Sequence, residues 1–396
     1  MNSKTKKIVL ISVILYAVSS LLSYLLFANT SFLSQTGLIN TPVPAPKKEG
    51  TSDTERIVFD ASLPKTEVCP TNGAKYSKQQ RKWWEQHRPL GVMIENSVDA
   101  RPQSGLQSAD VVYEAIAEGG ITRFLAVFYC QDAGQIGPVR SARTYFLDFI
   151  SEYGNNPLYA HVGGANTPGP ANALGQIGDY GWNFYNDLNQ FSVPYPIFKR
   201  IESINGRSVA TEHTMFSNTG ALWDYAKEKR KLTEVDEDGL SWDTTFTEYK
   251  FKDDAPSSSR PAAQTVSHEF WDGYKDFAVN WVYDKATNTY ARKNGGIDHT
   301  DRNTKKPIMA KNVVILFMRE SRANDGYEGN LHMLYGTKGT GQALIFMDGK
   351  EVDGTWKKAD RESKTMLYDS KGQEIQLNRG LTWFSIVAPD TEVTVK

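Results

Sequence analysis

The sequence predicts a single N-terminal transmembrane helix, an α/β domain built on a mixed sheet with helices, and a mainly β C-terminal domain. Three observations support this fold class. A run of twenty uncharged residues lies near the N-terminus, short apolar runs alternate with helical patterns up to about residue 234, and strand-like runs separated by turn signals fill the last third of the chain. At 396 residues the chain is long enough for about two domains besides the anchor.

The composition excludes several classes of protein. Lys plus Arg number 45 and Asp plus Glu number 46, and this net charge of −1 argues against a nucleic-acid partner, because nucleic-acid binders usually carry a basic excess. The two cysteines exclude a disulfide-dense scaffold and a four-cysteine metal site. The chain contains no P-loop, His-Glu-x-x-His or Gly-x-Ser-x-Gly motif, so these motifs imply no cofactor.

Residues 8–27 form the predicted transmembrane anchor. They carry no charge, and at about 1.5 Å per residue a helix of this length spans the ~30 Å hydrocarbon core. Three lysines precede the run and no basic residue follows until Lys47, so the positive-inside rule keeps residues 1–7 in the cytosol and exports the rest. A cleaved signal peptide is the alternative, although the run exceeds a typical apolar region of about 7–15 residues. We expect a single-pass cell-membrane protein with an extracytoplasmic body.

Residues 28–82 are expected to form a stalk and an approach segment to the folded body. The stalk is polar and rich in turn residues, and the proline spacing in TPVPAPKKEG favours an extended polyproline-type conformation. Cys69 lies in the approach segment, and outside the cytosol it could form a disulfide with Cys130. Two unrelated thiols are the alternative, and the sequence leaves both open.

The α/β domain is expected over residues 83–234. Short apolar runs bounded by Gly, Pro and Asn are typical of buried strands, whereas the spacing of Tyr145, Phe149 and Tyr153 indicates a helical face. The expected elements are strands over 89–95, 123–130 and 158–164, a further element over 109–118, and helices over 141–153 and 220–231.

A linker or long loop is expected over residues 235–264, because this stretch is polar and contains KDDAPSSSRPAAQ. The mainly β domain follows over residues 265–396. Here the pair Asp348-Gly349 lies between two strand-like runs and predicts a two-residue hairpin turn, and a further Asp-Gly pair follows at 353–354.

The segment 136–146, IGPVRSARTYF, is the most informative for function. A Gly-Pro pair ends the preceding run, and Ser141 is the expected N-cap of the following helix. Arg140 and Arg143 are then expected to project around the helix N-terminus, where free N–H groups and two guanidinium forks could bind phosphate or carboxylate. The alternative is that each arginine pairs with an internal carboxylate. The available carboxylates are Glu95, Asp110, Glu114 and Glu118.

Other polar residues lie near the ends of the expected strands. Glu95 and Asn96 end an apolar run, where open α/β sheets usually place ligands, and Arg101 lies in the following loop. Glu118 and Arg123 flank a Gly turn, a pattern that is equally typical of a salt-bridged hairpin. The predicted ligand-binding residues are Arg140, Arg143, Arg101, Asn96, Glu95, Asp110, Arg123 and His161.

Two histidines and one polar turn are the remaining candidates for a site. Taken alone, His161 and His213 each fit a structural role better than a role in a site. Asp298, His299 and Asp301 could together ligate a divalent metal, but a solvated polar turn is the favoured interpretation. We therefore predict no metal site.

Several of these segments occur in a characteristic order: RPLGVMIEN, ARPQSGLQSADVVYE, EGGITRFLAVF, IGPVRSARTYF and HVGG. In this order they resemble the YerB-like family, bacterial extracytoplasmic proteins long labelled as a domain of unknown function. The match covers about residues 88–222, and residues 265–396 resemble the C-terminal domain of that family. The resemblance implies two domains and a cell-envelope location, but no reaction. This chain has an apolar anchor in place of the lipidated cysteine.

A weaker likeness concerns the LytR-CpsA-Psr cell-wall ligases, which show an early strand ending in Asp, a loop Arg, a Ser-Asp-Thr strand and an Ile-Pro-Arg-Asp motif. Asn96 stands in place of the first Asp, and Arg101 resembles the loop Arg. Residues 108–110 loosely match Ser-Asp-Thr, and Arg140 matches the arginine of the last motif, but Ser141 replaces the acid after it. The likeness implies a lipid-linked pyrophosphate ligand with magnesium. The two lost acids weaken the case for catalysis and for metal binding.

The sequence therefore predicts a membrane-anchored envelope protein that binds an anionic, phosphate- or pyrophosphate-bearing wall or lipid-linked ligand. The first alternative is a phosphotransferase or hydrolase acting on lipid-linked or wall polymers, with Glu95, Glu118 or His161 as the base. The second is an envelope protein–protein scaffold in which the arginines are structural. An open pocket lined by the candidate arginines would favour ligand binding, whereas their burial against carboxylates would favour a scaffold.

Overall fold

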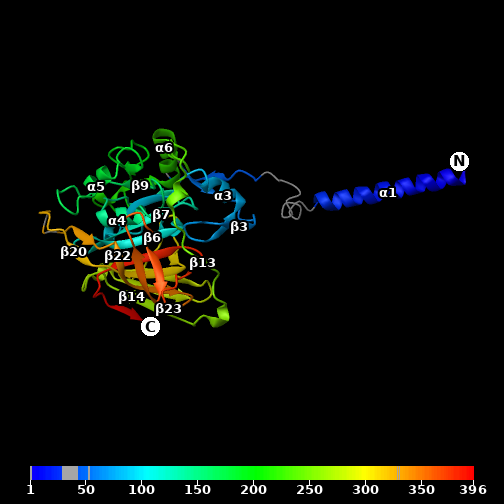
Figure 1. Cartoon of the computed structure of the whole chain (residues 1–396). Helices are drawn as coiled ribbons and strands as arrows, with labels where there is room; N and C mark the ends of the chain where they lie inside the picture. The colour runs from blue at the N-terminus through cyan, green and yellow to red at the C-terminus, as the bar shows by residue number, and fades with distance from the viewer. Residues whose placement is uncertain (1, 29–42, 52–53, 328, 330) are drawn as a thin grey trace. The chain divides into compact units, whose positions relative to one another are not determined.

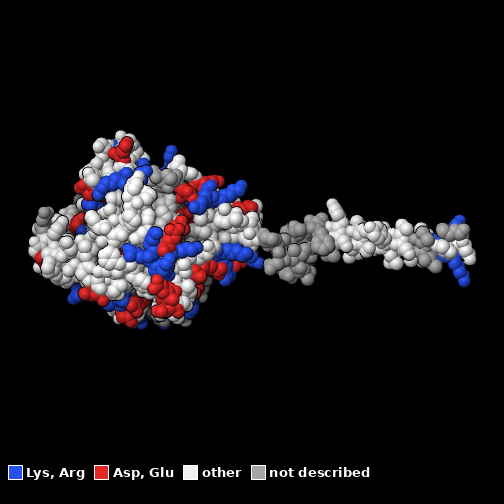
Figure 2. Space-filling view, turned by 90° about the horizontal axis from the view of Figure 1, so that it is seen from above, with Lys and Arg blue, Asp and Glu red and all other residues white. Residues whose placement is uncertain are grey.

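The computed structural model describes residues 2–28, 43–51, 54–327, 329 and 331–396, in two compact units, Met1–Ala45 and Pro46–Lys396 (Figure 1). In the first unit, helix α1 (Ser3–Ala28) contains an apolar stretch with a mean hydropathy of 2.3, long enough to cross a membrane. Its basic residues lie at its N-terminal end (Figure 2). A signal sequence satisfies the same criteria, so the single-pass anchor stays a prediction. Residues 29–42 of the predicted stalk lie outside the described residues.

The second unit is built on a mixed sheet of ten strands in the order β10-β9-β5-β7-β6-β26-β19-β22-β23-β24. Five strands come from the earlier part of the chain: β5 (Leu90–Glu95), β6 (Val111–Glu118), β7 (Ile121–Phe128), β9 (Leu158–His161) and β10 (Asp187–Asn189). Five come from the later part: β19 (Asn312–Phe317), β22 (Gly339–Met347), β23 (Lys350–Lys358), β24 (Met366–Asp369) and β26 (Thr382–Val387). The prediction of a mixed sheet is confirmed.

The two predicted domains share this sheet. Strands β6 and β26 run parallel, with Val111 opposite Thr382 and Glu114 opposite Ser385. Apolar side chains from both parts of the chain also form one continuous buried core. Burying both faces of the joined strands explains why β5, β6, β19 and β26 read as almost uninterrupted apolar runs.

A second, smaller sheet lies in the C-terminal part of the chain, in the order β17-β16-β15-β14-β27. Its strands are β14 (Thr265–His268), β15 (Val279–Asp284), β16 (Thr289–Asn294), β17 (Ile297–Asp298) and β27 (Val393–Val395), and β18 (Met309–Ala310) also pairs with β16. Short ladders complete the unit. Four of them are strand pairs: β1 (Lys47–Glu49) with β2 (Arg56–Val58), β3 (Lys65–Val68) with β4 (Lys75–Ser77), β13 (Phe251–Lys252) with β25 (Leu377–Asn378), and β20 (Glu320–Arg322) with β21 (Met333–Tyr335). One has three strands, in which β12 (Met215–Asn218) lies between β8 (Gln135–Ile136) and β11 (Lys199–Arg200).

Helices are few and short in the described part of this unit, so the body is mostly β. They are α3 (Lys78–Trp84), α4 (Thr144–Ile150), α5 (Ala173–Asp179) and α6 (Thr219–Arg230). In α6, Asn218 accepts a hydrogen bond from the N–H of Ala221 and three basic residues occupy the last turn, which suits the helix dipole. The predicted strands and the helix over 220–231 lie within a few residues of their expected positions.

The helix expected over 141–153 begins later than predicted, and Ser141 does not cap it. Helix α4 starts at Thr144, and its N-cap is Arg143, whose side chain makes no capping hydrogen bond. The reason is long-range backbone pairing: the N–H of Arg140 donates to the carbonyl of Met93, and the N–H of Ala142 donates to the carbonyl of Gly163. These bonds hold residues 138–142 in an extended conformation beside the sheet.

Candidate anion-binding site

Four of the predicted ligand-binding residues lie near one end of the paired antiparallel strands β5 and β7. They are Glu95, Arg123, Arg140 and Arg143, and Glu118 joins them. Glu95 is the last residue of β5 and lies opposite Arg123 in the antiparallel register. The extended segment before α4 then adds Arg140 and Arg143 from a different part of the chain.

Glu118 lies at the centre of this arginine–carboxylate cluster. Arg143 Nη2 donates a hydrogen bond to Glu118 Oε2, and Arg123 Nη2 lies 3.2 Å from Oε1. Burial alone would raise the pKa of Glu118, but the attraction of Arg123, Arg143 and Arg140 outweighs burial and lowers that pKa to about 2. Arg123 and Arg143 are themselves buried. These two arginines are therefore both paired with Glu118.

Arg140 is the most accessible arginine of the cluster. Its side chain is 25% exposed, and its Nε lies 3.4 Å from Glu95 Oε1. That Nε is buried but has no hydrogen-bond partner, so the contact with Glu95 is electrostatic rather than a well-formed hydrogen bond. Arg140 therefore keeps donor capacity that the cluster does not use.

Two further residues, His213 and Ser97, contact Glu95 of this cluster. The sequence did not predict either of them as a ligand-binding residue. His213 Nδ1 lies 3.0 Å from Glu95 Oε2, and Ser97 Oγ lies 3.1 Å from Glu95 Oε1 and 3.3 Å from His213 Nδ1. Ser97 and Glu95 both contact Nδ1 of His213. The three side chains therefore do not form a Ser-His-carboxylate triad, in which the histidine lies between the other two residues. His213 lies in a short turn of polar residues, where no local pattern indicates its contact with Glu95.

Asn96 and Arg101 belong to a different, buried network and not to the arginine–carboxylate cluster. Asn96 Nδ2 donates to Thr122 Oγ1 at 2.7 Å, and Asn96 Oδ1 accepts from Asn294 Nδ2 at 2.6 Å. Arg101 Nη2 donates to the carbonyl of Asn96 at 2.9 Å, and its guanidinium stacks over Phe277. The network therefore joins β5 and β7 to β16 and to the start of β15, which is a structural role.

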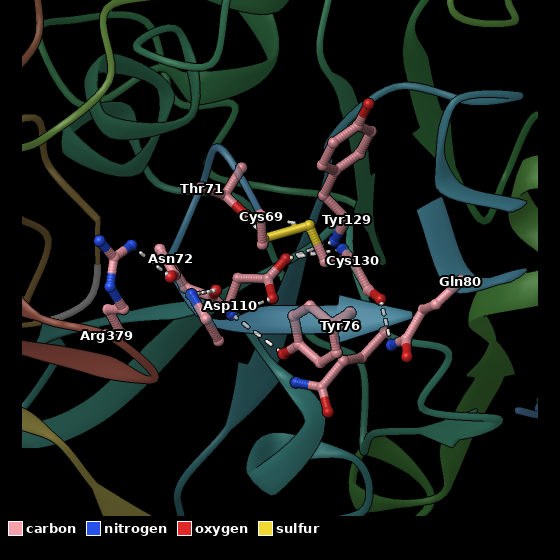
Figure 3. Close-up of a disulfide and its surroundings, with 12 residues drawn as sticks. Cys69, Thr71, Asn72, Tyr76, Gln80, Asp110, Tyr129, Cys130 and Arg379 are labelled. Carbon is pink, nitrogen blue, oxygen red and sulfur yellow. Dashed lines mark hydrogen bonds between the residues drawn. A yellow bond between two sulfur atoms is a disulfide. The ribbon is translucent and has the colours of Figure 1, made fainter. Parts of the chain in front are cut away.

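Asp110 is also separate from the cluster, because it lies beside the disulfide between Cys69 and Cys130 (Figure 3). Its carboxylate accepts hydrogen bonds from the N–H groups of Tyr129 and Cys130 and from Asn72 Nδ2, at 2.8, 2.9 and 2.6 Å. Burial raises the pKa of Asp110 to about 7, although the N–H groups of Cys130 and Tyr129 and the hydroxyl of Thr71 oppose the shift. The disulfide and Asp110 together attach the approach segment to β6 and β7.

His161 is fully buried and faces protein groups on both sides. Its Nδ1 lies 2.6 Å from the carbonyl of Gly163, and its Nε2 lies 2.6 Å from Asp187 Oδ1. The ring therefore joins β9 to β10 and offers no nitrogen to a ligand. Both ring nitrogens face protein groups, which favours the structural interpretation of His161 over a role as a base.

The polar turn predicted over 298–301 is not solvated throughout, because His299 and Asp301 are buried. His299 Nε2 lies 2.7 Å from Gln103 Oε1, and Asp301 Oδ2 accepts the N–H of Gln107 at 2.9 Å. These contacts tie the turn to the loop before β6. Within the described residues, the set that brings three ligating groups within 4.8 Å is Cys69, Asp110 and Cys130, whose two sulfurs are consumed by the disulfide.

Comparison with known proteins gives matches along most of the chain. A model described as the N-terminal domain of a protein of unknown function, DUF3048, matches residues 75–233, and the DUF3048 C-terminal domain matches residues 266–384. A Bacillus subtilis (strain 168) protein described as "Putative lipoprotein YerB" is 29% identical over 308 residues, which cover 78% of this chain and 83% of that protein.

A solved structure gives the same picture of the fold. The crystal structure of YerB from Bacillus subtilis matches with a TM-score of 0.66 and 24% sequence identity, and the match covers 83% of this chain and 100% of that chain. The likeness to LytR-CpsA-Psr ligases has no support from these matches and stays a prediction from the order of motifs.

Proposed function

This chain belongs to the DUF3048 family of proteins of unknown function, as its resemblance to YerB-like proteins predicted, and we propose that it binds an anionic, phosphate- or pyrophosphate-bearing wall or lipid-linked ligand at the cell envelope. In this proposal the ligand meets Arg140, with His213 beside it. Arg123 and Arg143 contribute through their charge while they remain paired with Glu118.

The main support for the proposal is the excess of positive charge around the partly exposed guanidinium of Arg140. Three arginines surround two carboxylates, Glu95 and Glu118, and their combined field is strong enough to lower the pKa of Glu118 to about 2. An anion that approaches Arg140 enters the same field. Because the Arg140 side chain is one-quarter exposed, the accessible part of its guanidinium can donate charge-assisted hydrogen bonds to an anion.

The proposal includes a membrane location. Helix α1 is apolar enough to span a bilayer, three lysines precede its apolar part, and the Bacillus relative is described as a putative lipoprotein. In the proposed topology α1 is retained as a single-pass anchor, and the body Pro46–Lys396 works outside the cytosol near the membrane surface. A lipid-linked ligand would then be within reach of the body.

Binding is tested by titrating the full-length chain, in neutral detergent micelles, with a polyprenyl pyrophosphate. The uncharged polyprenol of the same length is the matched control ligand. Saturable binding of the pyrophosphate with no binding of the alcohol is the expected result. Equal binding of both would show that the chain or the micelle recognises the hydrocarbon, and would contradict an anion site.

An enzymatic alternative is favoured by one observation, the contact between His213 and Glu95. A carboxylate that accepts from Nδ1 orients an imidazole and supports it as a base, which is the arrangement that general acid–base catalysis requires. Release of inorganic phosphate from the lipid pyrophosphate, lost in His213→Gln but retained in Ser97→Ala, would establish this alternative.

The burial of Arg123 and Arg143 favours the second alternative, an envelope scaffold. Absence of binding for both the pyrophosphate and the alcohol would support the scaffold.

A further inference from the structure

An open groove lies at the second sheet, and no residue of the arginine–carboxylate cluster lines it. It has a volume of about 760 Å³, within the range of sites that hold drug-sized ligands, and it is lined by residues at the end of β14, in β15 and in the segment leading into β27. Figure 1 shows β14 and the C-terminal strand in the same region of the body, and the two strands are hydrogen-bonded neighbours.

The lining of this groove is strongly acidic. Five carboxylates line it, and no Lys or Arg is among the lining residues: Glu269, Asp272, Glu320, Asp390 and Glu392. Glu269 pairs with Lys275, and Glu320 accepts hydrogen bonds from Trp271 Nε1 and from a tyrosine. The other three are exposed and have no ion-pair partner within the described part of the chain. The chain as a whole is almost neutral, so this local excess of negative charge is a property of the groove.

A buried histidine in the groove lacks the partners that buried polar groups normally have. His268 is 4% exposed, lines the groove, and has no hydrogen-bond partner at either ring nitrogen. Burial, with a smaller contribution from Arg292, lowers the pKa of His268 to about 3, so the ring is neutral and one nitrogen can accept a hydrogen bond. Asn280 Oδ1, also in the lining, is a second buried acceptor without a partner. The register sets Asn280 opposite Ser267 and His268 opposite Val279, so the two side chains lie on opposite faces of the sheet and do not converge on one ligand group.

We propose that this groove binds a basic peptide segment of an extracytoplasmic protein, with Lys or Arg side chains directed at its carboxylates. The complementarity of charge selects a cation, and the half-buried ring of Trp271 in the lining can stack against an ammonium or guanidinium group. The groove is open and its carboxylates come from several segments of the chain, so a peptide with several cationic side chains meets more of them than a single amine does.

The neighbouring sheet edge favours a peptide over a small amine. Among the described strands, β27 pairs with β14 alone and ends the sheet. The N–H and C=O groups of Thr265 and Lys396 bond to one another, and antiparallel ladders alternate bonded and non-bonded pairs. The main-chain groups of Val393 and Val395 therefore point away from β14, where an added strand could pair with them.

The proposal is tested by fluorescence anisotropy of a labelled hexalysine peptide titrated with the full-length chain in neutral detergent micelles. We expect saturable binding that weakens about tenfold in the double variant Asp390→Asn/Glu392→Gln, since each rim charge contributes a modest amount. The matched control is Asp179→Asn/Glu228→Gln, which removes two exposed charges elsewhere in the body and should bind like the wild type.

Three results would overturn the proposal. The first is an affinity for hexalysine no greater than for a hexaglutamate peptide. The second is an equal loss in the two double variants, because that would reflect net charge alone. The third is saturable calcium binding that the Asp390→Asn/Glu392→Gln variant loses while peptide binding is absent, because the groove would then be a cation site. Thermal melts establish that each variant is folded before its affinity is compared.

Discussion

Glu114 of β6 and Arg292 of β16 form a completely buried ion pair between residues 178 positions apart in the sequence. Arg292 Nη2 donates to both carboxylate oxygens, at 2.9 and 2.7 Å, and its guanidinium stacks over the ring of Trp383, 4.7 Å from the centroid. Trp383 Nε1 also donates to Glu114 Oε2. The pair therefore connects the ten-stranded sheet to the second sheet, and the two parts of the chain fold as one body.

Removing one partner of this pair should destabilise the body strongly. In Arg292→Met the carboxylate of Glu114 stays buried without its counter-charge, and breaking a buried pair in this way costs about 3–5 kcal/mol. Urea unfolding followed by tryptophan fluorescence measures the loss. In the double variant Glu114→Leu/Arg292→Met the cost should be smaller than the sum of the two single changes. Strictly additive losses would show that the two side chains do not act as a pair.

The stability contributed by Glu118 should depend on pH. Its pKa is about 2 in the folded protein and near 4.5 when unfolded, so its ionised form stabilises the fold above about pH 4.5 and this stabilisation is lost as the pH falls towards 2. Glu118→Gln should lower the free energy of unfolding by about 1–3 kcal/mol at pH 7, and the difference should vanish near pH 2. Unfolding curves at several pH values provide the measurement. A difference that stays constant with pH would exclude the charge of Glu118 as its cause.

The bond between Cys69 and Cys130 should be present in protein isolated without reductant. It closes a loop of 61 residues, which corresponds to roughly 4 kcal/mol of stabilisation in the chain-entropy model. Thiol titration of the denatured chain should find no free thiol, and the variant Cys69→Ser/Cys130→Ser should melt at a lower temperature. Two titratable thiols in the native preparation would contradict the pairing.

The proposed topology predicts that the body is accessible from outside the cell. Protease added to intact spheroplasts should release a fragment that contains Pro46–Lys396, because in the proposed topology α1 crosses the membrane once and the compact unit that follows lies outside the cytosol. A cytosolic marker protein that remains uncut is the control for intact membranes. Cleavage that requires lysis would reverse the assigned orientation.

Local patterns were sufficient to predict much of the sheet. The apolar runs that became β5, β7 and β9 are visible in the sequence because strands buried on both faces carry few polar residues. The turn at Asp348-Gly349 was also predicted correctly, and both residues adopt positive φ, as a two-residue hairpin of this type requires. The second Asp-Gly pair, at 353–354, lies inside β23 instead, because pairing with both neighbouring strands outweighs its turn preference.

Long-range pairing was not predictable in the same way. The parallel contact between β6 and β26 joins segments that are far apart in the chain, and no local periodicity encodes which strands become neighbours. The same limitation applies to the start of α4, where backbone bonds to distant strands keep Ser141 out of the helix.

The candidate site was predicted in part. The sequence placed Arg140 and Arg143 around a helix N-terminus and offered Glu95 as one of four carboxylates that could pair with them, but it could not decide which pairs form. That outcome depends on side-chain geometry, which places Arg143 against Glu118 and leaves Arg140 partly exposed. His213 was missed as a site residue because its contact with Glu95 spans 118 positions.

The measurement that tests the central claim most directly is a calorimetric titration of the full-length chain, in neutral detergent micelles, with inorganic pyrophosphate. Arg140→Ala should weaken binding about tenfold to a hundredfold, because one charge-assisted contact contributes roughly 1.5–3 kcal/mol. Arg140→Lys should recover part of the loss, since a point charge cannot reproduce the guanidinium fork. The control Arg322→Ala removes an exposed arginine of β20 and should bind like the wild type. An Arg140→Ala variant that is folded and binds pyrophosphate as tightly as the wild type would contradict the account.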